Sequence, residues 1–150
     1  MALARSKLNI GWSSVTITPL PSGTATTLDE ITNVSPSKSN AVKAFFGDAH
    51  LFATLILSRQ LERHLTITTG NVFDATAIQE NQPYTIVAIW NDAKNAASTG
   101  AITITLANAV CTKNGANGPA NDFGVATLEF QAYSSDGSTD PLSVTQAAPV

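Results

Sequence analysis

Apolar and polar residues alternate one by one in several short segments of this chain. The longest case is VATLEFQAY at 125–133, in which every second residue from Ala126 to Ala132 is apolar. Successive side chains of a β-strand point to opposite faces, so a period of two predicts strands with one face in a core and the other toward water. A helical period of 3.6 residues does not produce this pattern, and the chain is therefore expected to be mainly β.

The same alternation predicts about eight strands separated by loops rich in Gly, Pro, Ser and Asn. Strands are expected at 12–20, 28–34, 41–46, 52–58, 64–69, 85–90, 101–110 and 125–133. Loops are expected at 21–27, 35–40, 91–100, 113–122 and 134–142. The tail at 142–150 is expected either to add an edge strand or to be a mobile C-terminal segment.

One short helix is expected among these strands. Asn71 can cap VFDATAI, whose Val72, Ala75 and Ile78 fall on one helical face. The segment LILSRQLERHL at 55–65 also fits a helical stripe, but two strands with a charged link are the favoured interpretation. The prediction is a β-sandwich or flattened barrel of about eight strands with one short flanking helix, in a single domain over residues 1–150.

The expected core takes the apolar positions of the alternating runs. They are Val15, Ile17, Leu55, Leu57, Ile104, Leu128 and Phe130.

Charge is scarce in this chain. Charged residues make up 13% of it, and eight Lys/Arg against eleven Asp/Glu leave a net charge of −3. Nineteen Thr, thirteen Ser and eleven Asn supply the polar surface instead. Binding to a phosphate backbone depends on clustered Lys and Arg, so ordinary nucleic-acid binding is not expected.

The first twelve residues lack the apolar stretch of a signal peptide, and LFATLIL at 51–57 is too short to cross a membrane, which predicts cytoplasmic synthesis and no membrane insertion.

The residues that could carry chemistry are few, and no catalytic motif, cofactor-binding motif or metal-binding motif occurs. The histidines are His50 and His64, and the single cysteine, Cys111, is expected as a half-buried thiol at a strand end. A Cys111–His pair that meets only in space stays open as a minor alternative. No cofactor, metal or catalytic residue is therefore predicted, and the chain is not expected to be an enzyme.

Three aspartates lie in loops rich in Gly and Asn: Asp122, Asp136 and Asp140. Calcium ligation is one interpretation, but no calcium-loop spacing is present, and turn chemistry explains an Asp136-Gly137 pair better.

The densest charge cluster is Arg59, Glu62, Arg63 and His64. It is interpreted either as a solvated strand end or hairpin tip, or as a salt-bridge patch between subunits, which would fix the register of copies that carry little other charge.

Taken together, the final third of the chain resembles the tail tube proteins of tailed bacteriophages. The resemblance is carried by the β-run and loop that precede AITITLANAV (101–110), by VATLEFQAYSSDG at 125–137 and by STDPLSV at 138–144. The earlier segments ATTLDEITNVSPSKSNAVKAFFGD and LTITTGNV resemble the early strand pair of that family and the strand that leads into its helix. The inner tubes of contractile tails and type VI secretion tubes are related, and a long flexible-tailed phage is the first choice.

The resemblance implies a structural virion protein whose hexameric rings stack into the hollow tube that conducts DNA from capsid to cell. It implies contacts with further copies, with a tape measure protein and with a tail terminator, and only transient, non-specific passage of DNA. The implied location is the virion tail, assembled in the host cytoplasm. A β-sandwich binding module, such as a capsid decoration or carbohydrate-recognising protein, is the alternative, although Trp12 and Trp90 lie in apolar runs and form no obvious sugar platform.

Overall fold

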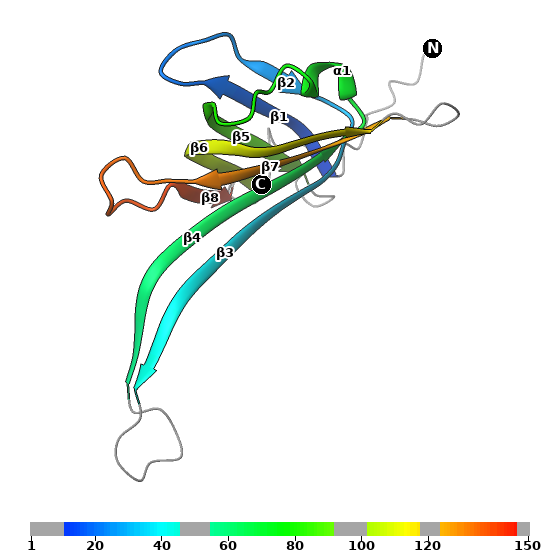
Figure 1. Cartoon of the computed structure of the whole chain (residues 1–150). Coiled ribbons are helices and arrows are strands. Elements are labelled where there is room, and N and C mark those ends of the chain that lie inside the picture. The colour runs from blue at the N-terminus through cyan, green and yellow to red at the C-terminus, as the bar shows by residue number, and fades with distance from the viewer. Residues whose placement is uncertain (1–10, 46–54, 92–101, 118–123, 147–150) are drawn as a thin grey trace, which may run out of the picture.

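The computed structural model describes residues 11–45, 55–91, 102–117 and 124–146, without the side chains of residues 13, 41–45, 55–60 and 91. It is mainly β, as the alternation predicts (Figure 1). In chain order the elements are β1 (Gly11–Pro19), β2 (Thr26–Leu28), β3 (Ile31–Phe45), β4 (Leu55–Thr69), α1 (Val72–Ala75), β5 (Pro83–Asn91), β6 (Ile102–Asn117), β7 (Val125–Ala132) and β8 (Leu142–Gln146).

One antiparallel sheet joins these strands in the order β2-β1-β5-β6-β7-β4-β3, and β8 pairs with β6. The long strand β6 connects two parts of the sheet. Strand β5 pairs with its residues from Ile102 to Val110, β8 pairs with Ile102–Leu106, and β7 pairs with the stretch from Ala109 to Asn117. The two parts fold over one another as a sandwich. In the described residues the end strands β2 and β3 are not paired with each other, so the sheet does not close into a barrel.

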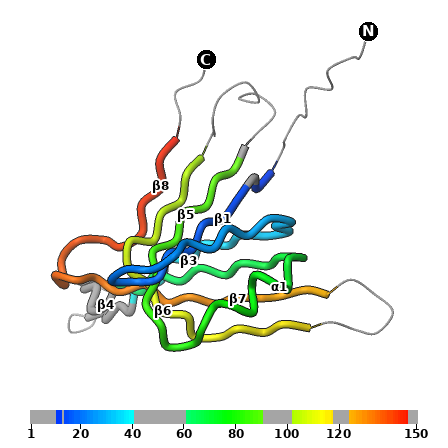
Figure 2. The backbone as a smooth tube through the Cα atoms, turned by 90° about the horizontal axis from the view of Figure 1, so that it is seen from above, coloured from blue at the N-terminus to red at the C-terminus, as the bar shows by residue number. Residues whose placement is uncertain are grey.

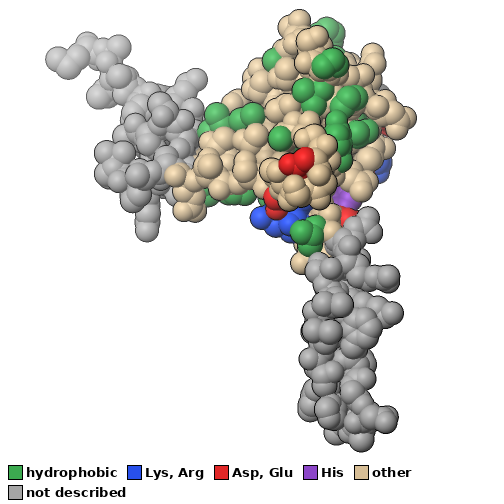
Figure 3. Space-filling model, turned by 90° about the vertical axis from the view of Figure 1, so that its left-hand side faces the viewer, with side chains coloured by type: hydrophobic (Ala, Val, Ile, Leu, Met, Phe, Trp, Pro, Cys, Tyr) green, Lys and Arg blue, Asp and Glu red, His purple; other side chains and the backbone are tan. Residues whose placement is uncertain are grey.

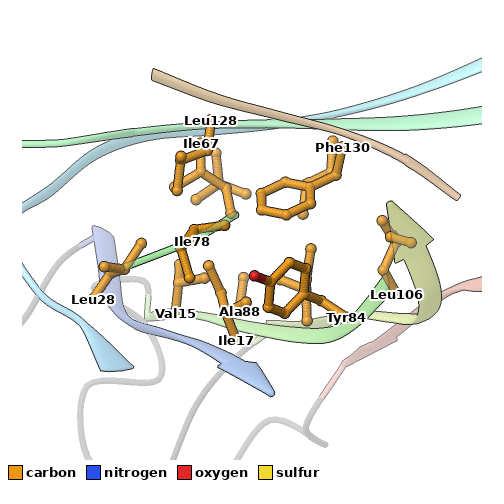
Figure 4. Packing of buried hydrophobic residues seen from close by; sticks show 14 of the residues in the cluster. Val15, Ile17, Leu28, Ile67, Ile78, Tyr84, Ala88, Leu106, Leu128 and Phe130 are labelled. Carbon is orange, nitrogen blue, oxygen red and sulfur yellow. The ribbon is translucent and has the colours of Figure 1, made fainter. Parts of the chain in front are cut away.

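The core lies between the two parts of the sheet (Figure 4). Side chains of β4 and β7, including Ile67, Leu128 and Phe130, face those of β1 and β5. The rings of Phe130 and Tyr84 meet edge to face, 6.3 Å apart, across this gap. The predicted core residues Val15, Ile17, Ile104, Leu128 and Phe130 are all buried, and Leu55 and Leu57 have side chains outside the described part of the chain.

The predicted helix begins where Asn71 caps it, but it is shorter than the expected 72–78 because α1 ends at Ala75. The Asn71 side chain accepts a hydrogen bond from the backbone N–H of Asp74 at 3.2 Å, and Ala75 and Ile78 turn into the core. Asn114 of β6 donates from Nδ2 to the carbonyl oxygens of Ala75 (2.9 Å) and Ile78 (2.7 Å). These bonds satisfy carbonyls at the end of the helix and fasten α1 to the sheet.

The predicted breaks in β3 and β4 are wrong. Residues 35–40 were expected as a loop and 59–63 as a link, but β3 and β4 each run for 15 residues without interruption. The two strands pair from Ile31 opposite Thr69 to Phe45 opposite Leu55. Pairing between β3 and β4 satisfies the backbone groups that face the partner strand, and residues 35–40, which are all exposed, require no apolar alternation. The strand interpretation of 55–65 is confirmed over the helical one.

Strand β6 also runs further than predicted, because β7 pairs with it as far as Asn117 and so holds part of the expected loop 113–122 in the sheet. Cys111 therefore lies inside a strand and is fully buried, which corrects the expected half-buried strand end. Burial raises the pKa of the Cys111 thiol. The turn cluster before Leu142 is confirmed, and Leu142–Gln146 forms β8 at the edge of the sheet.

Candidate assembly interface

Strands β3 and β4 leave the body of the molecule as a two-stranded arm (Figure 1). Strand β7 pairs with β4 only between His64 and Thr69, so in the described residues the outer part of β4 has β3 as its only neighbouring strand. Every residue from Ser35 to Asn40 is exposed. A hairpin without a third strand or a covering layer is marginally stable in water. The arm therefore offers backbone and side chains that the single chain leaves uncovered.

A groove lies where the arm joins the body. It has a volume of about 530 Å³ and is bounded by Leu61 and Arg63 of β4, by Ala132 at the end of β7 and by residues of the segment 133–141 that follows. Leu61 is 60% exposed and Tyr133 is 41% exposed. Two large apolar side chains thus line a hollow that no described part of the chain fills.

Arg63 fastens the loop 134–141 to the base of the arm. Its Nε donates to both carboxylate oxygens of Asp140, at 3.2 and 3.1 Å, and its Nη2 donates to Oδ2 at 3.0 Å. The backbone N–H of Leu142 donates to Oδ1 of Asp140 at 3.0 Å. The Arg63 and Leu142 hydrogen bonds lower the pKa of Asp140. Because the Arg63 side chain is only 11% exposed, this pair forms a fixed part of the groove wall.

Asp136 organises the same loop from within. Its carboxylate accepts hydrogen bonds from the hydroxyls of Ser134 (2.7 Å) and Thr139 (2.6 Å) and from the backbone N–H groups of Ser138 (2.9 Å) and Thr139 (2.8 Å). These bonds hold the pKa of Asp136 well below its usual range. Gly137 follows at φ +73°, a conformation that favours glycine. The turn interpretation of Asp136 is confirmed, and Asp122 lies outside the described residues.

The predicted charge cluster does not form one patch. The side chains of Glu62 and His64 approach to 3.5 Å, and each is 41% exposed. Arg63 lies between them in sequence and points to the other face of β4, toward Asp140. The side chain of Arg59 is outside the described part of the chain. Figure 3 shows basic side chains where the body meets the arm and a further one at the edge of the body.

A second uncovered surface surrounds α1. Phe73 is 87% exposed on this helix. Beside it, the Asn71 side chain donates from Nδ2 both to Asp29 and to Asp74, which brings two carboxylates close together. Sequence reasoning assigned no role to Phe73 or Leu61. The exposure of Phe73 could have been predicted from the sequence, because Phe73 does not lie on the helical face formed by Val72, Ala75 and Ile78.

Among the described residues no group of three or more His, Cys, Asp or Glu side chains is arranged to hold a metal ion. In the same part of the chain no helix has the length and apolar character needed to span a membrane.

No protein-family model and no curated protein matches this sequence. Solved structures with a similar fold do exist. A chain of the anti-feeding prophage baseplate matches with a TM-score of 0.60 at 14% identity, over 89% of this chain and 91% of that one. A chain of the sheath–tube complex of the PVC extracellular contractile injection system matches with a TM-score of 0.55 at 17% identity, over 97% and 100%. A chain of the anti-feeding prophage cap, described as tube-terminating, matches with a TM-score of 0.55 at 15% identity, over 98% and 95%.

These matches cover nearly the whole of this chain and of each matched chain. At sequence identities this low, such matches show that the chains share a fold. The chain therefore has a tail-tube-like fold of the kind found in injection-system particles. The fold class predicted from the sequence is confirmed.

Proposed function

We propose that this chain is a structural subunit of stacked homo-hexameric rings that form the hollow tube of a tail-like particle. The observation that carries the proposal is the arm of β3 and β4. A ribbon exposed on both faces from Ser35 to Asn40 has little reason to persist in a free monomer, but it is stabilised when a neighbouring copy covers it. The near-complete match in fold to a chain of a tube-terminating cap and to a chain of a sheath–tube complex supports this role.

The proposed role needs no catalysis and no cofactor, and it takes residues 1–150 as one domain. A weakly charged, mildly acidic subunit suits a conduit for DNA, because a wall rich in Lys and Arg would hold the phosphates, whereas this one repels them weakly. Tape measure and terminator proteins are the further partners that such a tube requires. The particle that the sequence favours is a long flexible-tailed phage. The match to the PVC sheath–tube complex supports a contractile injection system as the second candidate particle.

The cluster Arg59, Glu62, Arg63 and His64 is part of the proposed contact between subunits. Glu62 and His64 supply its half-exposed charges on one face of the arm, and Arg63 holds the groove wall on the other. Both faces of the arm base are thus available to neighbouring copies.

The test combines sedimentation with electron microscopy of the purified chain. The full chain is expected to form rings or tubes as its concentration rises. In a matched variant, Asn-Gly replaces residues 40–61 and closes the arm between Ser39 and Glu62, which stand opposite each other, so that the Arg63–Asp140 pair is kept. This variant is expected to stay folded and to lose the tubes. A full chain that remains monomeric, above all one that binds glycans, would contradict the proposal and favour a binding module.

A further inference from the structure

Two uncovered surfaces lie at opposite ends of the body. One is the α1 end, where Phe73 is 87% exposed, and the other is the groove between the arm base and the loop 134–141. Figure 2 shows α1 and this loop far apart, on opposite sides of the body. The two surfaces cannot cover each other within one chain. Between two copies they can.

The two surfaces complement each other in shape and polarity. Phe73 projects from a short helix, and the groove is a hollow of about 530 Å³ with Leu61, Tyr133 and Pro141 among its lining residues. This volume lies in the range of protein pockets that take small molecules, so an aromatic side chain fits into it. Aromatic anchors that fill a hollow on the partner are also the contacts that dominate stable interfaces.

The charges at the α1 end are negative. Asp29, Glu30 and Asp74 lie in or beside the turn that enters α1, and none of them belongs to an ion pair in the described part of the chain. Asp29 and Asp74 share the amide of Asn71. The α1 end, which carries Phe73, thus also carries three carboxylates that form no ion pair among the described residues.

Basic side chains lie at the groove end, on the face of the arm that lines the groove. Lys38 stands directly opposite Arg63 in the arm, so both side chains lie on the face that also carries Leu61. Asp140 lines the groove, and Asp136 lies in the same loop. Asp140 neutralises Arg63, and Asp136 is occupied by the hydrogen bonds of its own loop. Lys38 is exposed and forms no ion pair among the described residues, which leaves it able to pair with an incoming carboxylate.

We propose that Phe73 of one copy seats in the groove of a second copy, beside Leu61 and Tyr133, with the carboxylates of the α1 end facing Lys38. The proposal rests on the ring-forming function and names the surfaces through which neighbouring subunits meet. Each copy offers one projection and one groove, so the contact is head to tail and can close into a ring or continue as a stack.

Two single substitutions test this contact because each destroys one surface and keeps the other. Phe73→Asp removes the projection, and Leu61→Asp removes the apolar wall of the groove. Both residues are largely exposed, so circular dichroism should show an unchanged fold. By sedimentation velocity each variant alone is expected to be monomeric, whereas an equimolar mixture forms one-to-one dimers and nothing larger. Val144→Asp is the matched control, because Val144 is 49% exposed and lies outside both surfaces, and it is expected to assemble like the unmodified chain.

The outcomes separate this contact from the broader proposal. If Phe73→Asp assembles like the unmodified chain, the contact is refuted while the ring-forming function stands. If both variants are monomeric and their mixture yields no dimer, the contact is also refuted, since the two intact surfaces would then fail to recognise each other. An unmodified chain that stays monomeric at every concentration overturns both proposals.

Discussion

Truncation of Phe130 to alanine tests how the two parts of the sheet are held together. Phe130 is 1% exposed, lies opposite Leu65 in β4 and Cys111 in β6, and meets the ring of Tyr84 edge to face at 6.3 Å. Removing a buried phenyl group costs about 3–5 kcal/mol, because transfer free energy is lost and a cavity remains. The Tyr84 hydroxyl accepts a hydrogen bond from the backbone N–H of Gln79 at 2.8 Å, which holds its ring in place. The cavity therefore collapses poorly, and the upper half of this range is expected.

Urea unfolding followed by circular dichroism measures this cost, at a protein concentration where sedimentation shows only monomer. The midpoint should fall while the slope of free energy against urea is unchanged. The melting temperature should drop by about 8–20 °C for a chain of this size. Gln131→Ala is the control, because Gln131 is exposed on the opposite face of β7, and it should stay within about 0.5 kcal/mol of the unmodified chain. A loss below about 1 kcal/mol for Phe130→Ala would refute the inward register of β7.

Three further predictions follow from the charged residues. Glu62→Lys should weaken assembly, as measured by sedimentation, without changing circular dichroism, and an unchanged yield of assemblies would count against a role in the subunit contact. Asp140→Asn should destabilise the chain toward urea at neutral pH, because the pKa of Asp140 is lowered in the folded state and its ionised form is the stabilised one. Its stabilising effect is present above the ordinary carboxyl pKa and is lost as the pH falls, so the gap between variant and unmodified chain should shrink in acid, and a gap independent of pH would contradict the Arg63 pairing. Duplex DNA should bind with a Kd of about 10⁻⁴ M or weaker at physiological salt in a fluorescence-anisotropy titration. Sub-micromolar, salt-sensitive binding would remove the electrostatic support for a conduit.

Local patterns were sufficient wherever one face of a strand is buried. The inward and outward sets of β7 follow directly from the alternation in 125–133, and Val15, Ile17 and Ile104 are buried for the same reason. The helix was predictable because an Asn cap and a periodic apolar face occur together at 71–78. In both cases one face of the element packs against the hydrophobic core, and the apolar residues therefore recur with the period of that element.

Local patterns failed in the arm and in the second half of β6. Residues 35–40 contain Pro, Ser, Lys and Asn, which are typical of a loop, yet they belong to an uninterrupted strand. The partner that holds them there is β4, and the pairing is made through backbone groups that are the same for every residue type except proline. Composition cannot report such a pairing when neither face of the ribbon is buried.

The candidate interface was foreseen only in part. The charge cluster drew attention to the base of the arm, but Arg63 turned out to pair with Asp140, 77 residues further along the chain. Leu61 and Phe73 were passed over because Leu61 falls in the expected link at 59–63 and Phe73 falls off the apolar face of the predicted helix. Their exposure became visible only once the elements around them had been placed.

The sequence by itself determined that this chain is mainly β, which faces of its strands are apolar and where α1 begins, because these properties depend on residues close together in the chain. The tertiary structure decided which strands are neighbours, that β3 and β4 extend as an arm, and that a groove and an exposed Phe73 lie at opposite ends of the body. These features depend on contacts between residues far apart in sequence, such as Arg63 with Asp140 and Asn114 with Ala75. Only the folded chain brings those residues within reach of one another.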